Sequence, residues 1–108
     1  MTASFRLSRA DLVRYAGASG DFNALHWSDE AAAAAGLGGV VAHGMLLAGL
    51  AMTLAGECRA SSVKFLKPVV VPETGDVVIT VDSAEKPDGA ELTVRCAGEL
   101  VARVNVRG

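Results

Sequence analysis

Hydrophobic residues recur with two different periods along this chain, and the change of period divides it into two halves. In the first half, apolar positions between Ser8 and Gly20 repeat every three to four residues, which predicts an amphipathic helix. Ser8 and Asp11 have the spacing of a capping box at its start, and Gly17 or Gly20 can end it. The residues expected on its buried side are Leu12, Val13, Tyr15 and Ala16.

Two further helices are predicted in the same half. Ser28 has the properties of an N-cap for a short helix over 29–35, which is acidic in its first turn and is followed by Gly36. The other helix runs from about His43 to Gly56 and carries no charged residue. A helix that is apolar on every side has no face for water, so we expect it to lie inside the protein.

The second half alternates apolar and polar residues, as β-strands do. The predicted strands are residues 62–71 (interrupted by Pro68), 77–82, 92–97 and 100–106, with a short edge strand at 5–7. Turn sequences at 73–76 and 86–89 separate three of them. Helices followed by strands with short links predict an α+β fold with an antiparallel sheet, and a sheet curled around the apolar helix satisfies both elements.

Composition narrows the possible classes of protein. The length of 108 residues suits a single domain over residues 1–108. The hydrophobic content of 51% exceeds what one small core needs, so we expect apolar surface to meet a second subunit. A net charge of −2 without a cluster of Lys and Arg argues against nucleic acid as a partner. The apolar stretch 37–56 is interrupted by glycines, and its helical part is too short for a membrane span.

The N-terminus and the cysteines predict a cytoplasmic protein. No basic segment followed by an apolar run begins the sequence, so we expect no secretion signal. Cys58 and Cys96 are isolated and are expected to be reduced. With only His26 and His43 as histidines and no Cys-x-x-Cys, we expect neither a metal nor a cofactor.

Two segments contain residues that could form a catalytic site. In the loop 20–27, Asp21, Asn23 and His26 stand among apolar residues, and loops that gather such groups on a scaffold often carry function. The alternative is a helix-capping aspartate beside a surface histidine. In the second segment, Gly44 begins the apolar helix, where free N–H groups and the macrodipole favour negative charge. A ligand oxygen could approach this glycine closely, as a thioester enolate requires, although Gly44 could instead only permit close packing.

Together these segments resemble the MaoC-like family of (R)-specific enoyl-thioester hydratases and 3-hydroxyacyl-thioester dehydratases. The matching residues are Tyr15, Ser19, Gly20, Asp21, Asn23 and His26, followed by Ala42, His43, Gly44 and Met45. The segment 63–69 is similar to the family's strand after the central helix. Ala24 stands where the family usually has proline, and both the N-terminus and the connection 57–62 are shorter than usual.

The resemblance implies a hot-dog fold, in which a curved antiparallel sheet wraps a central helix. It implies that water is added to or removed from the 2,3-bond of an acyl thioester, carried by coenzyme A or acyl carrier protein, in fatty acid or polyketide-type metabolism. By this resemblance Asp21 and His26 move the protons, the Gly44 N–H binds the thioester oxygen, and Ser19 and Asn23 hold the loop.

The resemblance also implies a dimer, either with a second copy or with another hot-dog chain. Two other functions remain as alternatives: a catalytic or structural subunit of a heterodimeric dehydratase, and a hot-dog thioesterase. We expect His43 to be a neutral structural residue and Trp27 to pack the loop. Three cationic side chains are candidates for contact with the phosphates of coenzyme A or with an acidic carrier protein, but we expect them to be solvated; they are Arg59, Lys64 and Lys67.

Overall fold

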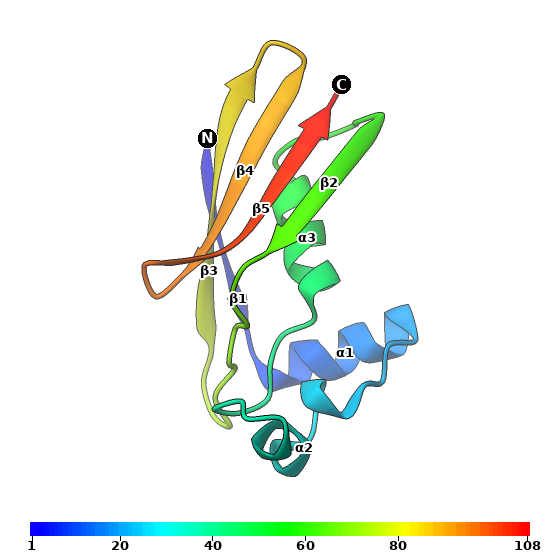
Figure 1. Cartoon of the computed structure of the whole chain (residues 1–108), viewed down its shortest axis with the longest axis vertical. Coiled ribbons are helices and arrows are strands. Elements are labelled where there is room, and N and C mark those ends of the chain that lie inside the picture. The colour runs from blue at the N-terminus through cyan, green and yellow to red at the C-terminus, as the bar shows by residue number, and fades with distance from the viewer.

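The computed structural model describes residues 1–108 and contains one sheet with helical segments on one side of it (Figure 1). The strands are β1 (Thr2–Leu7), β2 (Ala60–Phe65), β3 (Val77–Lys86), β4 (Gly89–Cys96) and β5 (Glu99–Arg107). The helical segments are α1 (Arg9–Ser19), the 3₁₀ turn η1 (Ala24–His26), α2 (Asp29–Ala34) and α3 (Gly44–Met52). All strand pairs are antiparallel, in the order β1-β3-β4-β5-β2, so the predicted α+β class is confirmed.

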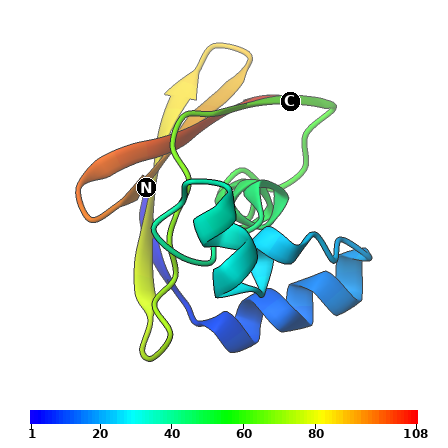
Figure 2. The same ribbon diagram turned by 60° about the horizontal axis from the view of Figure 1, so that its bottom comes forward.

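The sheet curves around α3, as Figure 2 shows from a second direction. Side chains of successive strand residues point to opposite faces, so every second residue of β3, β4 and β5 faces the helix. The inward residues in the middle of these strands are fully buried and form the core with one side of α3. They include Ile79, Val81, Leu92, Val94 and Val104, which meet Leu47, Ala48 and Ala51.

One side of α3 lies open in the single chain. Met45 is 60% exposed and Gly49 is also exposed, while Leu46 and Leu50 are half-buried. The prediction that the whole helix lies inside is therefore wrong for one chain, because the sheet covers only one of its sides. No helix has both the length and the apolar character that a membrane crossing requires.

Several element boundaries differ from the predicted ones. The strand expected over 62–71 is β2, which ends at Phe65; Pro68 lies beyond it and has no N–H for a ladder. Beyond Pro68 the chain pairs with the segment before α3 instead, through an isolated bridge between Val41 and Val70. Helix α3 ends at Met52, and turns follow it. Val13, expected on the buried side of α1, is exposed.

The start of α1 is fixed by two sets of contacts. Ser8 and Asp11 form the predicted capping box, in which the Ser8 N–H donates to Asp11 Oδ2 at 2.8 Å. Arg9, which the sequence pattern did not single out, donates two bonds of 2.8 Å to the carboxylate of Asp29 at the start of α2. Its Nε also donates to the Val71 carbonyl at 3.0 Å. Arg9 thereby ties α1, α2 and the segment after β2 together below α3.

Candidate active site

The loop between α1 and η1 is shaped by side chains that bond to backbone N–H groups two residues further along. Ser19 Oγ accepts from the Asp21 N–H at 3.2 Å, and Asp21 Oδ1 accepts from the Asn23 N–H at 3.2 Å. Asn23 Oδ1 in turn accepts from the Leu25 N–H at 3.1 Å. Short polar side chains stabilise turns in this way. We call Ser19, Asp21 and Asn23 the turn ladder; it provides the contacts that a loop-holding role for Ser19 and Asn23 requires.

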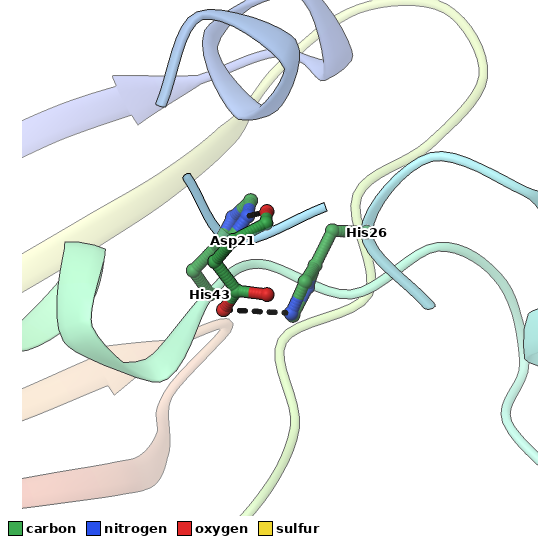
Figure 3. A group of neighbouring side chains, drawn as sticks. All are labelled: Asp21, His26 and His43. Atoms are coloured by element: carbon green, nitrogen blue, oxygen red, sulfur yellow. Dashed lines mark hydrogen bonds and ion pairs between the residues drawn. The ribbon is translucent and has the colours of Figure 1, made fainter. Parts of the chain in front are cut away.

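Asp21 and His26 face each other across this loop (Figure 3). His26 Nε2 lies 3.8 Å from Asp21 Oδ2; the aspartate side chain is 52% exposed and the histidine side chain 13%. The His26 Nδ1 lies 2.8 Å from the Val41 carbonyl, which can only accept, so Nδ1 carries a hydrogen. Nε2 is therefore the nitrogen left to exchange a proton. A distance of 3.8 Å is too long for a direct hydrogen bond, but an oxygen about 2.8 Å from each atom would bridge them.

His43 is buried directly behind this pair. It is 1% exposed, and its ring stacks on that of His26, with centroids 3.7 Å apart and planes inclined by 19°. Its Nε2 lies 3.1 Å from the backbone carbonyl of Asp21, so this nitrogen donates. Tyr15 of α1 makes an edge contact on it, at 4.7 Å between centroids. Burial lowers the pKa of His43, in accord with the expected neutral ring, while the bond to the Asp21 carbonyl acts in the opposite direction.

A cavity of about 490 Å³ opens beside Asp21 at the start of α3. Its volume is within the range of about 300–1,000 Å³ that is typical of ligand sites. His26 does not line it and lies behind Asp21. The lining residues come from the loop, α3 and the segment after β2, and they are Asp21, Ala42, Gly44, Met45, Leu47, Phe65, Leu66, Lys67, Pro68 and Val69.

Gly44 is in contact with the ring of Phe65. A Cβ on Gly44 would lie 2.9 Å from both Cε1 and Cζ of Phe65, which no side chain tolerates without movement. Phe65 thus fills the space that a Cβ would occupy, so close packing by itself already requires a glycine at this position. The Gly44 N–H lies in the first turn of α3 and donates no hydrogen bond within the chain, so it is free to bind a ligand oxygen.

Three groups with metal-binding atoms gather here, since Asp21, His26 and His43 bring one such atom each within 4.8 Å of the others. Nitrogen lone pairs lie in the plane of an imidazole ring. Because the two rings are stacked nearly parallel, their lone pairs point side by side rather than toward one point. One nitrogen of each ring is also bonded to a backbone carbonyl. This arrangement suits proton transfer better than coordination of an ion.

The remaining candidate residues lie around the site in different ways. Trp27 donates from Nε1 to the Phe22 carbonyl at 2.9 Å, so it does contact the loop, although most of its side chain is exposed. Lys67 lines the cavity and pairs with Glu99 at 3.2 Å. Arg59 and Lys64 do not line it. Phe65 and the stacking of His43 on His26 were not predicted, because neither contact follows from residue spacing.

Known proteins are similar to this chain in sequence and in fold. Residues 2–102 match the family described as the MaoC like domain. The chain belongs to the MaoC-like family. It is 38% identical over 99 residues to 3-hydroxyacyl-thioester dehydratase X of Mycobacterium tuberculosis (strain ATCC 25618 / H37Rv). That alignment covers 86% of this chain and 33% of the relative, so the chain spans about a third of the length of that curated protein.

Solved structures of similar proteins have the same fold. HtdX from Mycobacterium tuberculosis superposes with a TM-score of 0.86 at 34% identity, over 98% of this chain and 44% of that chain. The (R)-hydratase from A. caviae involved in PHA biosynthesis superposes with a TM-score of 0.72 at 29% identity, over 98% of this chain and 91% of that one. The predicted hot-dog fold, a curved antiparallel sheet around one central helix, is confirmed for this member of the MaoC-like family.

Proposed function

We propose that this chain is an (R)-specific 3-hydroxyacyl-thioester dehydratase and enoyl-thioester hydratase, with Asp21 and His26 as its catalytic pair. The observation that carries the proposal is the 3.8 Å separation of Asp21 Oδ2 from His26 Nε2 beside a cavity at the start of α3. The names of the mycobacterial dehydratase and the A. caviae (R)-hydratase support the same chemistry.

The pair can serve both proton transfers of the reaction. In hydration, a water oxygen between the two groups bonds to C3 while one of them accepts its proton, and a proton is delivered to C2. Dehydration reverses these steps. A carboxylate and an imidazole are suited to this because each can accept a proton in one direction of the reaction and release it in the other. The Val41 carbonyl keeps His26 Nε2 available for the transfer by occupying Nδ1.

Negative charge develops on the thioester oxygen during the reaction, and the start of α3 is the part of the site that stabilises it. The free N–H of Gly44 and the positive end of the helix dipole stabilise charge there. Ser19 and Asn23 support the reaction through the turn ladder. Met45, Leu47 and Phe65 provide apolar cavity wall for the acyl part of the substrate.

The substrate we assign is an acyl thioester on coenzyme A or acyl carrier protein. Residues 1–108 form a single domain, and we place it in the cytoplasm, where the free thiols of Cys58 and Cys96 stay reduced. The open side of α3 supports pairing with a second hot-dog chain, either another copy or a different one. In the second case this chain is the catalytic subunit, because it retains both Asp21 and His26.

The test is hydration of a short 2-enoyl-CoA, followed by the loss of the enoyl-thioester absorbance and by the chirality of the product. We expect the (R)-3-hydroxyacyl thioester from the wild-type chain, and a rate lower by about 10³-fold from Asp21→Asn. Gel filtration of the same sample gives the oligomeric state. Hydrolysis to free coenzyme A in place of hydration would show a thioesterase and overturn the proposal, as would full activity of Asp21→Asn.

A further inference from the structure

We propose that His43 is a positioning residue that holds both members of the catalytic pair in place, an inference that rests on the proposed function. One ring makes both contacts. Its Nε2–H donates to the Asp21 carbonyl at 3.1 Å, and its face lies on the ring of His26 at a centroid separation of 3.7 Å. Asn23 also bonds to both residues, since its N–H donates to Asp21 Oδ1 at 3.2 Å and its carbonyl accepts from the His26 N–H at 3.0 Å, but these bonds do not reach the ring of His26.

Stability alone does not account for a histidine here. Position 43 is the N-cap of α3, where Ser, Thr, Asp or Asn would accept from a free N–H, yet the His43 side chain makes no capping bond. Its Nδ1 is buried without any hydrogen-bond partner, which costs free energy. A residue selected for folding would avoid both penalties. The histidine is instead explained by the two contacts that its Nε2 and its ring face make.

Each contact restricts a different motion. The bond from the buried His43 ring to the Asp21 carbonyl fixes the loop backbone at Asp21, and therefore the position from which its carboxylate extends. His26 is bonded at Nδ1 to Val41, but that single bond leaves its ring free to tilt. The parallel ring of His43 sets the plane of His26 and hence the direction of its Nε2. Small displacements of catalytic groups from their reactive geometry lower turnover strongly.

The protonation state of His43 fits this role. The groups around its ring are His26 and Asp21 of the loop and Tyr15 of α1. His43 is also the N-cap of α3 and so lies at the positive end of the helix dipole. Burial lowers its pKa. The ring therefore remains neutral and keeps one fixed donor, while the charge of the reacting imidazole can change beside it.

Two substitutions separate the two contacts. His43→Phe keeps an aromatic face on His26 but removes the donor to Asp21, and we expect kcat to fall about 100-fold with little change in KM. His43→Gln keeps an N–H at a similar reach but removes the ring, and we expect a smaller loss of about tenfold. In His43→Gln, nitrogen NMR of the His26 ring should show mixed tautomers, whereas the wild type and His43→Phe should show the Nδ1–H form.

Val94→Ala is the matched control, because it removes buried volume from β4 and Val94 does not line the cavity. It should lower the melting temperature but leave kcat unchanged for folded protein. Wild-type kcat, within about twofold, in both His43 variants would overturn the proposal, as would an equal loss of kcat in Val94→Ala. If the wild-type chain hydrates no enoyl thioester, the proposed function fails and the NMR decides separately: unchanged His26 signals in His43→Gln refute positioning, and mixed tautomers support it.

Discussion

The loop that carries Asp21 and His26 and the sheet formed by β3, β4 and β5 are held together by different interactions. In the sheet, inward side chains such as Ile79 and Leu92 are fully buried, and every strand pairs along its length. In the loop, the Asp21 side chain is half exposed, and the backbone depends on the turn ladder and His43. The free energy of unfolding should therefore depend mainly on the sheet, and turnover should depend on the orientation of a few polar groups in the loop.

The largest effect is expected from His26→Gln in the loop. Glutamine cannot exchange a proton at the position of Nε2, so kcat should fall about 10³-fold, equivalent to about 4 kcal/mol in the activation barrier. The free energy of unfolding should change little, because the loop contributes little buried apolar surface. Turnover of the enoyl thioester and a urea titration measure the two quantities on one sample. A large loss of stability would show that the loop and the sheet are not separable.

Leu92→Ala in β4 should have the opposite effect. Leu92 is fully buried against the core, and its truncation leaves a cavity that costs about 3 kcal/mol of unfolding free energy. This is a large part of the stability of a small domain. The midpoint of the urea titration should fall, while kcat of the protein that remains folded stays at the wild-type level. A fall in kcat as large as that of His26→Gln would contradict the comparison.

Gly44→Ala tests the contact between the start of α3, beside the loop, and Phe65 at the end of the sheet strand β2. The added Cβ would lie 2.9 Å from two ring carbons of Phe65, so the start of α3 or the ring must shift. Since alanine keeps the N–H, we expect displacement of that N–H to lower kcat about 100-fold, or about 2.7 kcal/mol. Phe65→Leu in the same chain should restore part of kcat, and Phe65→Leu alone is the control. Normal turnover in Gly44→Ala would show that the Phe65 ring moves to accept the Cβ and that the N–H is not displaced, contrary to this expectation.

The sheet was more predictable from sequence than the geometry of the site. Period-two alternation identified β4 and β5 within a few residues, because inward positions of a half-buried strand must be apolar. The polar residues of the loop could also be recognised as a group. Their relation to His43 could not, because a stacking contact across seventeen positions of the chain depends on how α3 meets the loop. Apolar surface for a second subunit was expected, but its place on one side of α3 was not, since an apolar pattern does not say which chain covers it.

A smaller effect should follow from breaking the turn ladder. Asn23→Ala removes the acceptor for the Leu25 N–H, one bond among several that fix the loop. We expect kcat to fall about tenfold, or about 1.4 kcal/mol, with the free energy of unfolding nearly unchanged. Asn23→Asp keeps an acceptor oxygen and serves as the matched control. Equal rates for Asn23→Ala and the wild type would mean that Ser19 and Asp21 hold the loop without this bond.

The smallest effect should come from the β4–β5 turn, which lies in the sheet and away from the loop. Ala97 and Gly98 both have positive φ, at 53° and 79°, which is the backbone of a two-residue type I′ hairpin. Alanine is strained in this left-handed region, whereas asparagine tolerates it. Ala97→Asn should therefore raise the free energy of unfolding by about 1 kcal/mol and leave kcat unchanged. Because the substitution acts only on the sheet, a change in turnover would show that the sheet's stability limits the motion of the active-site loop.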